Sequence, residues 1–150
     1  MKTLYTKFLG AVAAAMLLAS CEKDEIQAVM NPTAAVEPTL SAQTVVLLKD
    51  DAAKDALTIS WAKPDFGFDA APAYTVLIDK KGGDFAKATA VSVAGELKKT
   101  FKVSELNSIL TGLGLAAGTA SDVDVKAQST LGPKTTLVSA VKTFKATPYL

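Results

Sequence analysis

Short apolar segments, each broken by a turn after a few residues, recur from residue 45 to residue 144. Within most segments apolar residues alternate with polar ones, as in Leu57-Thr58-Ile59-Ser60-Trp61. A period of two places the apolar side chains on one face of a β-strand, and that face is then buried. Seven strands are predicted, at residues 45–48, 57–61, 74–79, 89–93, 101–103, 123–127 and 137–144. This spacing favours an all-β, seven-strand sandwich of fibronectin type III or immunoglobulin-like form.

One segment between the fifth and sixth strands departs from the strand pattern. Four apolar residues recur there at the spacing of one helix face: Leu106, Ile109, Leu110 and Leu113. Ser104 precedes them as a candidate N-cap, so we predict a short helical crossover that packs on one end of the sandwich. Alternation is also imperfect in residues 137–144, which predicts a bulge or an edge position in the last strand.

Residues 1–20 have the three parts of an export signal. Lys2 and Lys7 form a positive N-terminal region, and the apolar core that follows is shorter than the about 20 residues of a membrane-spanning helix. Leu18-Ala19-Ser20-Cys21 resembles the bacterial lipobox, in which the cysteine receives a diacylglycerol before cleavage. Cys21 is the only cysteine of the chain. We therefore predict a cleaved lipoprotein signal peptide and a lipid anchor on Cys21.

The segment directly after Cys21 is acidic and reads Glu22-Lys23-Asp24-Glu25. Such a run resembles the surface-export signal of Bacteroidetes lipoproteins and predicts exposure at the cell surface; the alternative is a charged tether in the periplasm. Pro32 and Pro38 lie among small polar residues with no regular period, which is typical of a linker. After the signal, the predicted parts are an anchor and flexible tether (21–37), a sandwich (38–147) and the start of a linker (148–150).

Composition excludes several classes of protein. The chain has no histidine, which removes the common histidine-dependent serine and cysteine catalysis and any histidine-ligated zinc. A single cysteine cannot form an internal disulfide or a thiolate cluster. A formal net charge of +1 gives no strong attraction to nucleic acid. We therefore expect no cofactor, no metal site and no nucleic-acid partner.

Carboxylates are the remaining candidates for catalysis. Asp122 and Asp124 are two residues apart on one strand, which places both on one face with Cα atoms about 7 Å apart. Glycosidases use carboxyl groups about 5 to 9 Å apart, but charged residues also commonly line an exposed strand face, and no apolar pocket is implied that would raise a pKa. Three further aspartates match no EF-hand spacing: Asp50, Asp51 and Asp55. We predict that the protein is not an enzyme.

Aromatic rings are what a glycan-binding surface requires, because sugar faces stack on them. Trp61, Tyr74 and Phe101 fall on inward positions of their strands and are predicted to be core residues. Phe66 and Phe68 flank Gly67 in the loop between the second and third strands. Loops on a rigid scaffold commonly bind ligands, so these two rings are the candidate ligand-binding residues. The alternative is that they close the end of the core.

Several of these segments occur in an order that resembles one family. The matching segments are Ala56-Leu57-Thr58-Ile59-Ser60-Trp61, Pro64-Asp65-Phe66-Gly67, Tyr74-Thr75-Val76, Ser104-Glu105-Leu106-Asn107 and Asp122-Val123-Asp124-Val125-Lys126. Together with the lipobox, acidic start and tether, they resemble the SusE-like lipoproteins of Bacteroidetes starch utilization systems. The resemblance covers residues 38–147, the N-terminal module of that family. Full-length members continue with further domains, so the chain is expected to be a single-domain relative or part of a longer protein.

The resemblance implies a non-enzymatic surface module of a starch or glycan binding and uptake system. Because the family's glycan sites lie in its later domains, the resemblance implies a spacer or scaffold for this one. Two alternatives stay open: a carbohydrate-binding module that contacts starch through loop aromatics, and a protein–protein adaptor for the outer-membrane transporter complex. The expected partners are the outer membrane, through the N-terminal lipid, a starch-like polysaccharide and that complex.

Overall fold

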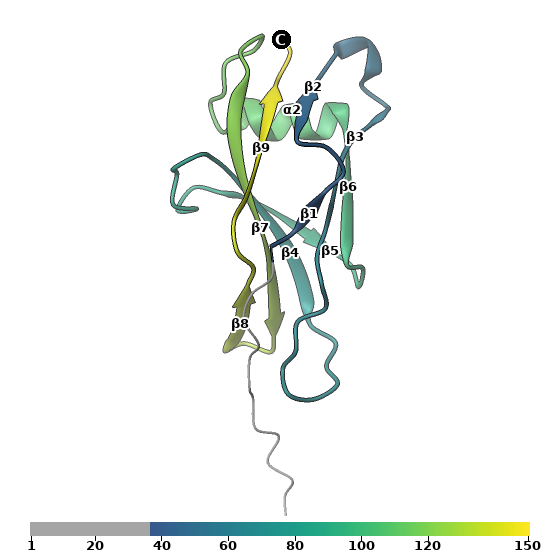
Figure 1. The fold of residues 1–150 in the computed structure, drawn as a ribbon, viewed down its shortest axis with the longest axis vertical. Helices are drawn as coiled ribbons and strands as arrows, with labels where there is room; N and C mark the ends of the chain where they lie inside the picture. The colour runs from purple at the N-terminus through teal and green to yellow at the C-terminus, as the bar shows by residue number, and fades with distance from the viewer. Residues whose placement is uncertain (1–36) are drawn as a thin grey trace, which may run out of the picture.

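The computed structural model describes residues 37–150, which form nine β-strands, one α-helix and one short 3-10 helix (Figure 1). The strands are β1 (Thr39–Leu40), β2 (Thr44–Val46), β3 (Asp55–Ser60), β4 (Ala73–Lys80), β5 (Thr89–Val93), β6 (Lys98–Lys102), β7 (Ser121–Leu131), β8 (Thr135–Val138) and β9 (Lys142–Thr147). The α-helix α2 spans Val103–Gly112, and the 3-10 helix η2 spans Lys49–Asp51. The predicted signal peptide, the Cys21 anchor and the tether up to residue 36 lie outside the described residues.

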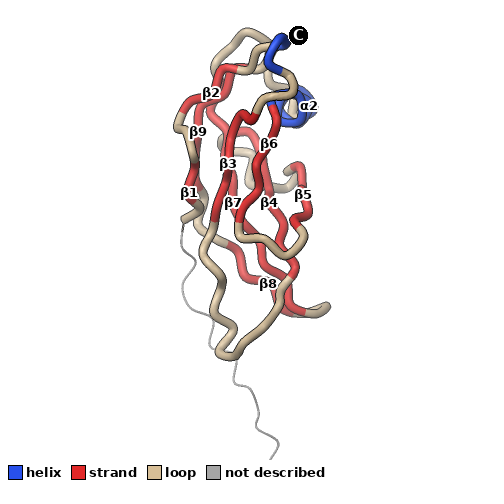
Figure 2. Tube along the Cα trace, turned by 90° about the vertical axis from the view of Figure 1, so that its right-hand side faces the viewer, coloured by secondary structure: helices blue, strands red, loops and turns tan. Residues whose placement is uncertain are grey.

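The strands form two sheets that pack as the layers of a sandwich (Figure 2). The smaller sheet has the order β1-β3-β6 and is antiparallel. The larger sheet has the order β2-β9-β7-β4-β5, and β8 also pairs with β7. Its strands are antiparallel except for β2 and β9, which run parallel. The prediction of an all-β sandwich with one helical crossover is confirmed.

The hydrophobic core lies between the two sheets and is built by the alternating residues that the sequence predicts. Its least exposed members include Leu57, Ile59 and Phe101 from the smaller sheet and Val76, Ile78, Val123, Val125 and Phe144 from the larger. Full burial of side chains of this size stabilises a fold by about 1.5–3 kcal/mol each. The residues between them face outward, as Asp122 and Asp124 do on β7.

The helix α2 covers the end of the core at which the C-terminus lies (Figure 1). Leu106 and Leu110 are fully buried, and Ile109 and Leu113 pack beside them, as the helical spacing predicts. We call this end of the sandwich the helix end. The opposite end, formed by the β3–β4 loop and the β7–β8 turn, is called the loop end. No helix in residues 37–150 is long and apolar enough to cross a membrane.

The start of α2 differs from the prediction. Val103, expected in a strand, is the first helical residue, and the N-cap is Lys102, whose side chain makes no capping hydrogen bond. Ser104 therefore lies in the first turn. The backbone N–H groups of Val103 and Ser104 instead donate to the carbonyls of Lys54 and Ala52, at 2.9 and 3.0 Å. Because the neighbouring segment satisfies these free N–H groups, no side-chain cap is needed.

Two further differences turn seven predicted strands into nine. β1 has only two residues, too few to show a period in the sequence. The predicted strand 137–144 is divided into β8 and β9, which pair with β7 in different registers: Val138 faces Gln128, whereas Lys142 faces Val125. Three residues thus lie opposite two, which is one extra residue and a bulge. The irregularity expected in this segment thus lies at residues 139–141, where it separates β8 from β9.

Candidate functional site

The loop between β3 and β4 carries the predicted ligand-binding pair. The Asp65 carboxylate accepts a hydrogen bond from the backbone N–H of Gly67 at 2.7 Å, which closes a tight turn. Gly67 has a φ of +83°, a backbone conformation that residues with a side chain rarely adopt. The chain therefore turns sharply between Phe66 and Phe68.

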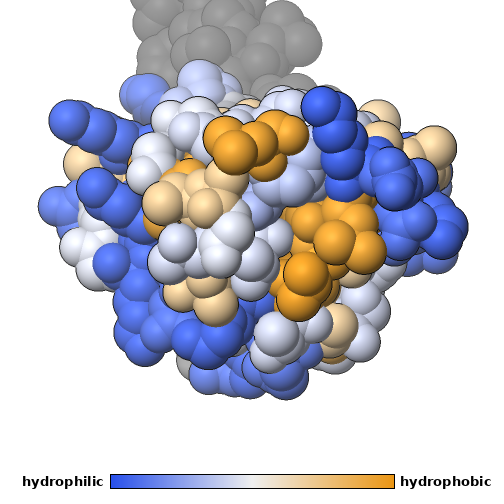
Figure 3. Space-filling model, turned by 90° about the horizontal axis from the view of Figure 1, so that it is seen from above, coloured by the Kyte–Doolittle hydropathy of each residue, from blue (hydrophilic) through white to orange (hydrophobic). Residues whose placement is uncertain are grey.

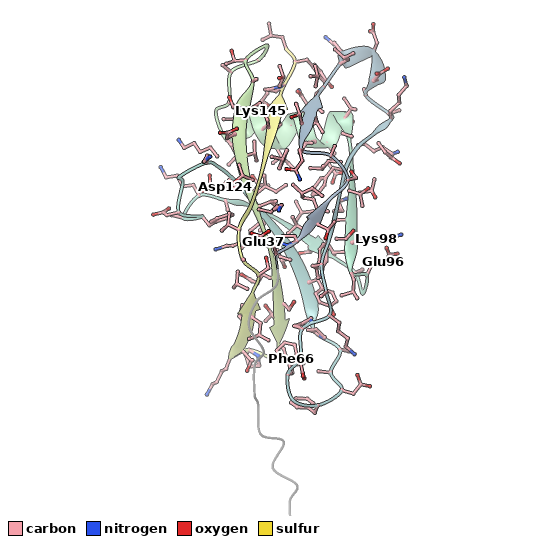
Figure 4. All side chains as sticks on the ribbon, viewed as in Figure 1. Glu37, Phe66, Glu96, Lys98, Asp124 and Lys145 are labelled. Carbon is pink, nitrogen blue, oxygen red and sulfur yellow. The ribbon has the colours of Figure 1, made fainter. Side chains whose placement is uncertain are left out.

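Phe66 and Phe68 differ in exposure as a result. Phe66 is 2 % exposed and lies at the loop end of the core (Figure 4). Phe68 is 41 % exposed. The structure therefore does not bring two rings together at the surface. Phe66 closes the end of the core, which is the alternative that the sequence left open, and Phe68 alone of the pair offers a ring face to a ligand.

A pair of exposed charges accompanies Phe68 on the loop. The Lys63 ammonium donates to the Asp69 carboxylate at 2.7 Å, and the Asp69 side chain is 95 % exposed. The hydrogen bond, and then the charge attraction, raises the pKa of Lys63 and lowers the pKa of Asp69. Ion pairs this exposed contribute little stability, so both groups can exchange their mutual bond for bonds to ligand hydroxyls.

The other aromatic side chains of residues 37–150 do not extend this surface. Trp61 and Tyr74 are buried with ring centroids 5.8 Å apart, and Phe101 is fully buried, which confirms their prediction as core residues. The Trp61 indole nitrogen is buried without an acceptor among the described residues. Phe85 is half-buried and lies under the Lys126 ammonium at 4.0 Å. Within residues 37–150, Phe68 is the most exposed aromatic side chain.

The two carboxylates on β7 are engaged in structural contacts. Asp122 accepts from Lys145 at 2.8 Å and from Lys81 at 3.4 Å (Figure 4 labels Lys145). The Lys145 hydrogen bond and charge, followed by those of Lys81, lower the pKa of Asp122. Asp124 accepts from the Thr143 hydroxyl at 2.6 Å. A general acid needs a raised pKa, so the lowered pKa of Asp122 favours the interpretation as surface charges over a glycosidase pair.

Of the three aspartates near η2, Asp50, Asp51 and Asp55, the last two have lysine partners. Asp51 pairs with Lys54 at 2.8 Å and Asp55 pairs with Lys102 at 3.0 Å. No group of three or more cysteine or acidic side chains within residues 37–150 is placed to hold a metal ion.

Asn107 has a structural role that its sequence pattern did not predict. It lies on the buried face of α2, and its side-chain amide donates to the Tyr149 carbonyl at 3.1 Å while its carbonyl accepts from the Tyr149 N–H at 2.7 Å. The Gly118 N–H donates to the Pro148 carbonyl at 2.7 Å. The chain after β9 is thus bonded to the helix end through Pro148 and Tyr149. A polar residue on a helix face that is otherwise apolar was the available signal, since buried amides need partners.

The chain matches the model of a known protein family. The model of the family described as SusE outer membrane protein matches residues 23–128, which is more than half of the chain. The match ends within β7, whereas the same sheet continues through β8 and β9. No curated protein matches the chain. The length of the family match and the sandwich seen in the structure agree with the resemblance found in the sequence, and the chain belongs to the SusE outer membrane protein family.

Proposed function

We propose that the protein is a non-enzymatic, lipid-anchored module on the cell surface that acts as a spacer or scaffold in a starch or glycan binding and uptake system. Membership of the SusE outer membrane protein family supports the role in this uptake system and the location at the outer membrane. The lipobox at Cys21 and the acidic residues after it support the anchor and the surface exposure.

The observation that carries the spacer role is the placement of the aromatic rings. A platform for a sugar chain stacks successive rings on exposed aromatic faces, yet Trp61 and Tyr74 are buried in the core between the sheets, and Phe66 is buried at the loop end. One half-exposed ring, Phe68, offers a small contact area. The β7 carboxylates add no catalytic pair, since Asp122 and Asp124 hold lysine and threonine partners.

The attachment of the chain at its two ends also suits a spacer. Glu37 lies beside the middle of the body, where its carboxylate pairs with Lys142 at 2.9 Å (Figure 4). The C-terminal segment leaves at the helix end, where Asn107 holds Tyr149 (Figure 1). Both ends of the described segment, Glu37 and Tyr149, are thus bonded to the sandwich.

Direct sugar contact is the first alternative, and Phe68 with the Lys63–Asp69 pair is the observation that favours it. An exposed ring flanked by polar side chains can stack on one sugar and bond its hydroxyls. A surface of one ring would bind weakly, so this function predicts low affinity for the domain alone.

Docking on the transporter complex is the second alternative. Val46, Leu48 and Leu150 are exposed apolar residues, and the parallel pairing of Val46 with Thr147 places them at the helix end. Figure 3 views this end and shows hydrophobic surface in separate patches among hydrophilic side chains. Exposed apolar surface of this kind is a common feature of protein contacts.

The deciding experiment titrates the full chain, released from the membrane with detergent, with starch and other polysaccharides. The spacer function predicts no saturable binding. Saturable binding that is lost in Phe68→Ala and kept in the control Phe85→Ala would replace it with the sugar-contact alternative. Saturable binding that survives Phe68→Ala would overturn both and place a site elsewhere.

Two further measurements test the lipid anchor and the adaptor alternative. Membrane fractionation should release the protein when Cys21→Ala removes the acylated sulfur, and retention of that variant would exclude the lipid anchor. Co-purification of the transporter that is lost in Val46→Lys/Leu48→Lys would favour the adaptor over the spacer.

A further inference from the structure

The free edges of the two sheets differ in how they are protected against pairing with another strand. Natural sheets protect their edges by keeping edge strands short or by placing charges on them. β1 and β2 have two and three residues, and β8 is a four-residue arm of a hairpin. β6 has five residues, of which three are lysines: Lys98, Lys99 and Lys102.

β5 has none of these protections. It is five residues long, reads Thr-Ala-Val-Ser-Val, and contains neither a charge nor a proline. Among the described residues it pairs with β4 alone, so it forms one margin of the larger sheet (Figure 2). The outward backbone N–H and C=O groups of such a strand are available for one more antiparallel partner.

The side chains of β5 would also allow another strand to pair with its free edge. Thr89, Val91 and Val93 face the core and are only half-buried, because β5 is the last strand over that part of the core. Ala90 and Ser92 face outward, are exposed, and are too small to obstruct a neighbouring strand. A partner strand would bury more of the two valines without displacing any described contact.

We propose that β5 pairs in antiparallel register with β5 of a second copy of this chain, which joins the two larger sheets into one continuous sheet across a two-fold axis. With Val91 at the axis, Val91 of one copy faces Val91 of the other. Ala90 then faces Ser92, and Thr89 faces Val93. Every pair joins residues that are uncharged and small or β-branched, which are favourable cross-strand combinations.

Charge complementarity at the two ends of β5 favours a second copy over an unrelated peptide. Lys87 lies in the turn before β5 and Glu96 lies just after the bend at Gly95, and both are exposed with no ion-pair partner among residues 37–150. Antiparallel pairing brings the start of β5 in one copy beside the end of β5 in the other, so the segment that carries Lys87 lies on the same side as the partner segment that carries Glu96. The two-fold axis repeats this arrangement of opposite charges at both ends of the strand. A five-residue strand alone buries less than the about 1,200 Å² of stable complexes, so the pairing should be weak in dilute solution.

Cysteine cross-linking tests the register. In the full chain with Cys21→Ala, Val91→Cys places two cysteines at the axis with Cα atoms about 4.5–5.5 Å apart, within the range of a disulfide. The matched control Ser92→Cys, on the same strand, places its cysteines about 8 Å apart, which is too far. Under mild oxidation Val91→Cys should form at least about tenfold more covalent dimer than Ser92→Cys. Equal cross-linking of the two variants would overturn the proposal.

Opposed charges give a second test that leaves the core untouched. Ala90→Lys/Ser92→Lys places lysines of the two copies directly opposite each other, and Ala90→Glu/Ser92→Glu does the same with carboxylates. Each variant alone should be monomeric in sedimentation equilibrium, whereas a mixture of the two should form heterodimers. A mixture that stays monomeric, or single variants that dimerise as the wild type does, would overturn the pairing. This inference does not rest on the proposed spacer role.

Discussion

The two ends of the sandwich hold their loops by different means. At the helix end the chain is fixed by a buried side chain, Asn107, which makes two hydrogen bonds to the backbone of Tyr149. At the loop end the polar bonds of the β3–β4 loop lie on its surface, in the Lys63–Asp69 pair and the Asp65 turn. A buried amide has no water to replace a lost partner, whereas exposed groups do. The comparison indicates that the helix end holds the outgoing chain rigidly and that the loop end depends on the packing of one ring.

The largest expected effect concerns that ring. Phe66→Ala removes a fully buried aromatic side chain from the loop end and should lower the free energy of unfolding by about 3–5 kcal/mol. Phe68→Ala removes a half-exposed ring from the same loop and should change it by less than about 0.5 kcal/mol. Urea unfolding of both variants measures the difference. Equal destabilisation by the two substitutions would contradict the assignment of Phe66 to the core and Phe68 to the surface.

The second largest expected effect concerns Asn107, the buried residue at the helix end. Asn107→Ala leaves the Tyr149 N–H and C=O without their partner and should cost about 1–3 kcal/mol of stability. The Tyr149 amide should exchange its hydrogen faster than the loss of global stability alone predicts, because the C-terminal segment is released from α2.

Ser108→Ala is the matched control for Asn107→Ala. Ser108 is the next residue of α2 and is exposed, and its side-chain hydroxyl donates to the carbonyl of Ser104 within the same helix. Its replacement should leave the Tyr149 amide protected. Protection of that amide in the Asn107 variant would mean that the hydrogen bond from Gly118 to Pro148 suffices to hold the chain.

The predictable part of the fold is the part that is set by residues close together in the sequence. The alternation of Leu57, Ile59 and Trp61 predicts which face of β3 is buried because pairing and burial follow from the same period of two. The stripe of Leu106 and Leu110 likewise predicts the inner face of α2. Both elements bury the predicted side chains.

The unpredicted part depends on partners far away in the chain. The N-terminus of α2 is satisfied by the carbonyls of Ala52 and Lys54, about half the domain away in sequence, so the local signal at Ser104 was misleading. Asn107 finds its partner at Tyr149, 42 residues later. Phe66 and Phe68 look equivalent in the sequence, and the folded structure separates them by burying Phe66 and leaving Phe68 exposed on either side of the turn at Gly67.

The smallest expected effect is the loss of stability, as the pH falls, that one carboxylate at each end of the sandwich contributes. The pKa of Asp122 lies below its ordinary value of 3.8 because Lys145 and Lys81 favour the charged form. A carboxyl group whose pKa is lowered by folding stabilises the fold above its ordinary pKa, and this contribution is lost as the pH falls through the lowered value. Asp122→Asn should therefore destabilise the protein at pH 7, and its difference from the wild type should shrink steadily below about pH 4.

Asp69→Asn is the matched variant at the loop end. The pKa of Asp69 is also lowered, by Lys63, but its carboxylate is 95 % exposed and has one lysine partner, whereas that of Asp122 is 37 % exposed and has two. Solvent screens the more exposed pair more strongly, so Asp69→Asn should leave the stability nearly unchanged at both pH values. Urea unfolding at pH 7 and pH 3 measures both variants. Asp122→Asn and Asp69→Asn could instead lower the free energy of unfolding by the same amount and with the same pH dependence. In that case the carboxylates at the two ends would not differ in their contribution to stability. The difference between the ends would then rest on Asn107 and Phe66 alone.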